Sequence, residues 1–94
     1  MAQDEQELRE MMHEGFVNII YIKKSTGEQR NAVATTNLDL IPKPKWPKEN
    51  PKIKEWKKDG YVRYFDYTVM EWRCLMMSNI CSYEFNDMLN TLRK

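Results

Sequence analysis

Histidine, cysteine and glycine are all scarce in this sequence, and each shortage excludes a kind of chemistry. The 94 residues include one histidine, two cysteines and three glycines. One imidazole and two thiols cannot supply the three or four nitrogen and sulfur ligands of a zinc site, and two cysteines are too few for a disulfide framework. Each glycine stands at the boundary of a predicted element, so none belongs to a glycine-rich phosphate cradle. We therefore expect no metal and no cofactor.

Long apolar runs are also missing. No stretch approaches the roughly 20 consecutive apolar residues that a membrane-spanning helix needs. Residues 1–14 are acidic and amphipathic, whereas a secretory signal is basic and then apolar. We therefore expect a cytoplasmic protein with no membrane partner. Because 94 residues rarely hold two separate cores, we also expect one domain over residues 1–94.

Charge is nearly balanced over the whole chain but uneven along it. The formal net charge is +1. Residues 1–14 carry five acidic side chains and one arginine, whereas residues 42–60 carry seven lysines and three acidic side chains. These poles are able to pair within one molecule, to pair between copies in a homo-oligomer, or to leave the lysine segment free for phosphates. All three alternatives stay open at this point.

Hydrophobic periodicity predicts a helix, five short strands and a second helix. Asp4 and Glu7 resemble a capping box at the start of the first helix, and Ser25-Thr26-Gly27 is typical of a hairpin turn. The expected segments are an acidic helix (1–14), a hairpin (16–36), a Lys/Pro/Trp-rich loop (42–60), barrel strands (61–85) and a short helix (86–94). The fold class is therefore mainly β with flanking helices (α+β), built on a small, closed or nearly closed five-stranded antiparallel barrel.

Several apolar residues have expected places in this fold. Phe65 and Trp72 should lie in the barrel core. Cys74 and Cys81 should occupy strand positions as small hydrophobic residues with free thiols. The terminal helix should carry an apolar stripe made of Met88, Leu89 and Leu92.

Three segments together resemble the small WYL-like domain of tailed bacteriophages and their bacterial relatives. They are Lys23-Lys24-x-x-Gly27-x-x-Arg30, Thr35-Thr36-Asn37-x-x-Leu40-Ile41-Pro42 and Tyr64-Phe65-Asp66-Tyr67…Trp72-Arg73…Ile80. The resemblance covers about residues 8–85 and implies an SH3-like or Sm-like β-barrel and a phage origin. Larger WYL domains are thought to bind nucleic-acid or nucleotide ligands, which extends to this chain by analogy alone.

The sequence departs from the family pattern at one position that bears on anion binding. After Trp72-Arg73 the family usually continues Ser-Phe-Arg, whereas this chain has Cys74, Leu75 and Met76. If the second arginine holds an anion in relatives, Met76 removes a bidentate donor.

The candidate binding residues combine lysines with tryptophans in the 42–60 loop and two arginines on the following strands. Lysines are able to track a phosphate backbone while an indole stacks on a base, and an exposed tryptophan is costly without a partner. The alternative is a solvated loop that its tryptophans hold in place. The candidates are Lys43, Lys45, Trp46, Lys48, Lys52, Lys54, Trp56, Lys57, Lys58, Arg63 and Arg73.

Two functional hypotheses follow, and neither is enzymatic, because nothing in the sequence places either cysteine beside a base. The first is a phage accessory module that binds and modulates a host protein, in host takeover or counter-defence, through methionine and aromatic side chains and the loop. Its alternative is nucleic-acid or nucleotide binding through the 42–60 loop with Arg63 and Arg73. The seven methionines and three tryptophans fit a partner-binding surface, and they also fit an irregular core.

Overall fold

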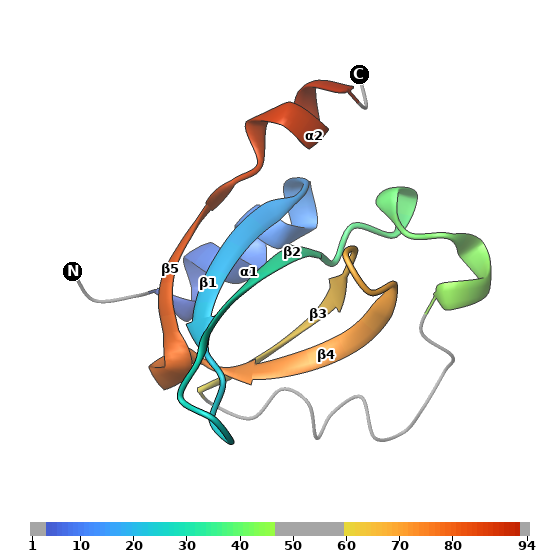
Figure 1. Ribbon diagram of the computed structural model, residues 1–94. Coiled ribbons are helices and arrows are strands. Elements are labelled where there is room, and N and C mark those ends of the chain that lie inside the picture. Colours follow the sequence, from blue (N-terminus) through green and yellow to red (C-terminus); the bar gives the residue numbers. More distant parts are fainter. Residues whose placement is uncertain (1–3, 47–59, 93–94) are drawn as a thin grey trace.

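The computed structural model describes residues 4–46 and 60–92, and it contains five strands and two α-helices in that part of the chain (Figure 1). The order is α1 (Glu5–Glu14), β1 (Val17–Ile22), β2 (Gln29–Thr35), η1 (Leu38–Leu40), η2 (Lys43–Lys45), β3 (Tyr61–Asp66), β4 (Glu71–Met76), η4 (Met77–Asn79), β5 (Ile80–Phe85) and α2 (Asp87–Leu92). The five predicted strands and two predicted helices are confirmed, and the start of the lysine-rich segment adds a 3-10 turn, η2.

The strands form one antiparallel sheet in the order β4-β3-β2-β1-β5. The expected five-stranded fold is confirmed, but the expected closure is wrong for the described residues, because β4 and β5 are both edges of the sheet. The three residues of η4 turn the chain so that β5 pairs with β1 and does not return beside β4. No helix in the described ranges is long and apolar enough to cross a bilayer.

Alternation along the strands assembles one core between the curved sheet and α1. Residues that enter this core recur two positions apart on a strand, as in Val17 and Ile19 or Ala32 and Ala34. The buried core cluster consists of Leu8, Met12, Val17, Ile19, Ala32, Ala34, Val62, Tyr64 and Ile80.

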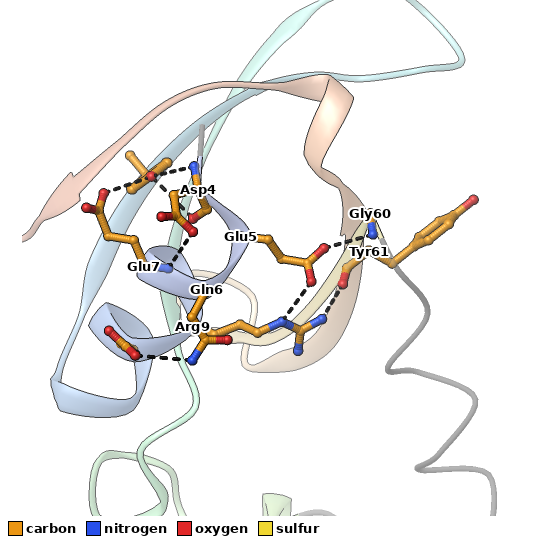
Figure 2. A network of polar contacts seen from close by, with 9 residues as sticks. Asp4, Glu5, Gln6, Glu7, Arg9, Gly60 and Tyr61 are labelled. Atoms are coloured by element: carbon orange, nitrogen blue, oxygen red, sulfur yellow. Dashed lines mark hydrogen bonds and ion pairs between the residues drawn. The ribbon is translucent and has the colours of Figure 1, made fainter. Parts of the chain in front are cut away.

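A tyrosine from the last strand completes the N-terminal cap of α1 (Figure 2). The Asp4 carboxylate accepts from the Glu7 backbone N–H at 3.1 Å, as the sequence predicts. The Glu7 carboxylate does not return to Asp4. It accepts from the Tyr83 hydroxyl at 2.9 Å, and that hydroxyl accepts from the Asp4 backbone N–H at 3.1 Å. The Tyr83 hydroxyl therefore stands between the Asp4 N–H and the Glu7 carboxylate, which would contact each other directly in a capping box.

Two more contacts tie α1 to the start of β3 (Figure 2). The Glu5 carboxylate accepts from the Gly60 backbone N–H at 2.8 Å, and the Arg9 guanidinium donates to the Tyr61 carbonyl at 2.6 Å. At least one acidic side chain of the first helix, Glu5, therefore has partners within the same molecule.

Two expectations about apolar residues need correction. Phe65 is fully buried as expected, but Trp72 is only half-buried, at the edge of Phe65 with a ring-centroid distance of 5.6 Å. Cys74 and Cys81 lie on strands, as expected, but both are exposed and do not pack as small hydrophobic residues.

The stripe of α2 is also not packed into the core. Met88 and Leu92 are each 74% exposed. Polar contacts hold the helix instead: the Asn90 side chain bonds both the N–H and the carbonyl of Phe16, and the Asn86 side chain accepts from the Leu89 N–H.

Thr35 joins the C-terminal end of α1 to the sheet, so we predict that Thr35→Val destabilises the protein by about 1–3 kcal/mol. The buried Thr35 hydroxyl donates to the Met12 carbonyl at 3.0 Å and accepts from the Asn37 N–H at 3.1 Å. Valine keeps the shape and removes both bonds. Urea unfolding monitored by tryptophan fluorescence measures the loss. The matched control is Thr36→Val at a half-buried neighbour, and equal losses from the two variants would contradict the assignment.

Candidate functional site

A pocket of about 790 Å³ lies between the β1–β2 hairpin and the β3–β4 hairpin. It has the size of a small-molecule site. Its walls come from the end of β1 and the turn after it, the first half of β2, both strands of the second hairpin and η4.

The pocket exists because β2 and β3 pair over a very short length. Their register holds only Ala34 against Asp66 and Thr35 against Phe65, whereas β1 pairs with β2 along the whole of β1. The N-terminal half of β2, which carries Arg30, therefore extends past the end of β3 without pairing with it, and the pocket lies between the two hairpins.

The walls of the pocket are strongly cationic. Four of the lining side chains are basic, namely Lys23, Lys24, Arg30 and Arg73, and one is acidic, Asp66. The first two lie in the hairpin turn, which Gly27 closes with a φ of 73°. The backbone N–H groups of Thr26 and Gly27 both donate to the Lys23 carbonyl and fix that turn, so the two lysines sit on an ordered rim.

The two arginines have only exposed or distant acidic partners. Arg30 pairs with Glu28 at 2.9 Å, and both side chains are about half exposed. Arg73 lies 3.8 Å from Glu71 and 3.9 Å from Asp66. An exposed ion pair contributes about 0–1 kcal/mol, so both guanidinium groups can turn to an anionic ligand at low cost.

Two buried polar side chains lie below this cationic rim. Asp66 is 4% exposed, and its Oδ1 accepts from the Thr68 N–H at 3.0 Å and the Thr68 hydroxyl at 2.5 Å. Tyr64 is 1% exposed and lies two residues earlier on the same face of β3. Burial, with smaller effects from nearby Tyr21 and Asp66, raises the pKa of Tyr64, so its hydroxyl stays protonated.

The structure separates the two arginines that the sequence analysis grouped. Arg73 is opposite Tyr64 in the register and lines the pocket. Arg63 lies on the other face of β3, where its guanidinium stacks 4.6 Å from the centroid of Trp72. Neighbouring strands were expected and are found, but the two side chains do not form one basic surface.

The described part of the lysine-rich segment packs on that second face. The Trp72 indole N–H donates to the Lys45 carbonyl at 2.7 Å. The Trp46 indole N–H donates to the Leu38 and Ile41 carbonyls, and Lys43 lies over the Trp46 ring. Trp46 thus holds its segment in place, as the solvated-loop alternative proposed. The remaining candidates lie outside the described residues: Lys48, Lys52, Lys54, Trp56, Lys57 and Lys58.

The sequence analysis did not assign Lys23, Lys24, Arg30, Tyr21 and Tyr64 to a binding site. Most of these residues belong to the segments that carry the family resemblance, so the signal was present. The sequence does not show how the two hairpins are placed in space. Their short pairing leaves one cavity that residues from both hairpins and from η4 line.

These features define a small antiparallel β-protein with a cationic pocket between its two hairpins. The comparisons agree with this class. The chain matches the WYL_2 family, described as an Sm-like SH3 β-barrel fold, over residues 5–81, and it belongs to that family. Neither the curated proteins nor the solved structures give a match to the chain.

Met76, where the chain departs from the expected family pattern, lines the pocket and pairs with Tyr61 in the register. The departure therefore falls within the candidate site. The cations Arg30 and Arg73 remain there, so the pocket keeps its charge without a further arginine at this position.

The separation of Arg63 from Arg73 predicts different effects on the Cys74 thiol. Partial shielding from water raises the pKa of Cys74, and the positive charge of Arg63 opposes this shift. In a Cys81→Ser background, the rate of alkylation of Cys74 by iodoacetamide should rise with pH to a midpoint above that of a free thiol. Arg63→Gln should move the midpoint further upward because it removes the opposing charge. Arg73→Gln, on the other face, should leave it unchanged, and a larger shift from Arg73→Gln would contradict the placement.

Proposed function

We propose that this protein is a non-enzymatic binding module whose pocket takes a phosphate-bearing ligand of the nucleotide or nucleic-acid class. The observation that carries the proposal is the excess of four basic side chains over one acidic side chain around a cavity of about 790 Å³. Arginine and lysine together suit phosphate, because guanidinium binds it with paired hydrogen bonds and ammonium adds mobile charge.

The binding surface in this proposal differs from the loop that the sequence favoured. The pocket uses Arg73 from the earlier set and adds the hairpin residues Lys23, Lys24 and Arg30. The described members of the loop have other contacts, since Lys43 and Trp46 face one another on the outer side. Substitutions in the pocket and in the loop should therefore have different effects on ligand binding.

Arg30→Gln should weaken binding of a single-stranded RNA oligonucleotide by about tenfold, because it removes one charge-assisted contact. Fluorescence anisotropy at several salt concentrations measures this, and the slope of log affinity against log salt should fall by about 0.7. Lys43→Gln makes the same change of charge outside the pocket and should have little effect. If Lys43→Gln were the more damaging variant, the loop and not the pocket would be the phosphate site.

A second candidate function is binding to a host protein by a phage accessory protein in the bacterial cytoplasm. It is supported by the apolar surface of α2, where Met88 and Leu92 are each 74% exposed although Asn90 fastens the helix to Phe16. Exposed apolar side chains that lie together favour a protein partner. Phage origin rests here on the sequence resemblance.

Replacing both Met88 and Leu92 by serine should abolish capture of a host protein by the tagged chain from bacterial lysate. Capture by the wild type should survive nuclease treatment, because no nucleic acid bridges the two proteins. Leu38→Ser, at an apolar side chain that is 39% exposed on η1, is the control and should preserve capture. Capture that nuclease removes would instead favour the nucleic-acid function.

Association of copies through the acidic helix and the lysine-rich segment remains a further prediction, which size-exclusion chromatography with light scattering can test.

A further inference from the structure

The hydroxyl of Tyr64 is a buried donor without a partner among the described residues. Its side chain is almost wholly buried, and no described side chain or backbone group forms a hydrogen bond with the hydroxyl. Yet no described side-chain oxygen or nitrogen that is fully closed off from solvent lacks a hydrogen bond. The Tyr64 hydroxyl must therefore open onto the pocket that this residue lines.

Asp66 offers an acceptor beside that donor by the same reasoning. Its Oδ1 is occupied by both groups of Thr68, whereas its Oδ2 has only the Arg73 Nε at 3.9 Å, too far for a hydrogen bond. Because the carboxylate is buried and no fully closed-off atom is unpaired, Oδ2 also faces the pocket. Tyr64 and Asp66 lie on one face of β3, so a donor and an acceptor stand together on the pocket floor.

This pair is unsuited to a phosphate, since a buried carboxylate repels a second anion. Phosphate belongs instead at the rim, where Lys23, Lys24 and Arg30 gather. In a nucleotide the sugar is bonded directly to the phosphate, so a phosphate held at the rim allows the sugar to reach the floor. A sugar hydroxyl both donates and accepts, and one such group satisfies a carboxylate oxygen and a phenol hydroxyl together.

We propose that Tyr64 and Asp66 form a ribose-reading floor, which makes the pocket selective for ribonucleotides over 2′-deoxyribonucleotides. The inference rests on the proposed function, because it assumes that the cationic rim holds the phosphate. Tyr64 would donate to the 2′-oxygen, and the 2′-hydroxyl would donate to Asp66 Oδ2. The shared chemistry is a phosphorylated ribose, whether in a free nucleotide or in RNA.

Calorimetric titration of the full chain with each of the four ribonucleoside triphosphates and its 2′-deoxy counterpart tests the selectivity without any mutation. At least one ribonucleotide should bind about tenfold or more tightly than its deoxy form, the effect of losing the hydrogen bonds of one hydroxyl. A hexameric RNA and the DNA of the same sequence form the second arm. A preference confined to the oligonucleotides would identify RNA as the source of the ribose, and one confined to the triphosphates would identify free nucleotide.

Tyr64→Phe tests the donor, and Tyr83→Phe is its matched control. Tyr64→Phe should lower ribonucleotide affinity about tenfold, leave deoxyribonucleotide affinity unchanged and not lower the melting temperature of the free protein, because the lost hydroxyl has no internal bond. Tyr83→Phe removes a hydroxyl that bonds Asp4 and Glu7, so it should lower the melting temperature and leave affinity unchanged. A purely structural role for Tyr64 would instead give a stability loss with no change in selectivity.

The outcomes separate this inference from the function beneath it. If ribo and deoxy forms bind equally and both weaken in Arg30→Gln, the phosphate pocket stands and the ribose-reading floor is overturned. If no triphosphate and neither oligonucleotide binds, the proposed function fails, and the inference fails with it.

Discussion

The short pairing between β2 and β3 is the contact on which the rest of the structure depends. Two residue pairs, Ala34 with Asp66 and Thr35 with Phe65, are the whole register between the two hairpins. One further backbone bond, from the Tyr67 N–H to the Val33 carbonyl, lies beside them. The core with α1 and the pocket both lie beside this junction, and Tyr64 belongs to both of them.

The β3–β4 hairpin serves two environments because its side chains alternate. One face carries Tyr64 and Arg73 to the pocket, and the other carries Phe65 and Trp72 to the segment that holds Trp46. The second face is closed by aromatic contacts and by indole N–H groups that bond carbonyls of residues 38–45. Tyr64 and Arg73 thus lie on the opposite side of this hairpin from Phe65 and Trp72, and a shift of register by one residue would exchange the faces of the shifted strand.

Local signals in the sequence were sufficient for most of the fold. The cap at Asp4, the turn at Gly27 and the alternation over residues 80–85 each act over a few neighbours, so the elements that they predict appear where expected. The openness of the sheet was not predictable in this way, because it depends on how η4 redirects the chain. The candidate site was predicted poorly for a related reason. Arg63 and Arg73 are both basic strand residues, and only the register, which pairs Arg73 with Tyr64, shows that they face apart.

The cap that Tyr83 completes on α1 links the two ends of the folding unit, since Asp4 and Tyr83 are 79 positions apart. During synthesis the first helix emerges early, but the hydroxyl that satisfies its leading amide emerges only with the final strand. Until then the helix start has the local Asp4 bond alone, and its core-facing residues lack the strands that bury them. Such long-range closure slows folding relative to local contacts and couples the first turn of the chain to its last strand. The complete cap of α1 therefore forms only when β5 is in place beside β1.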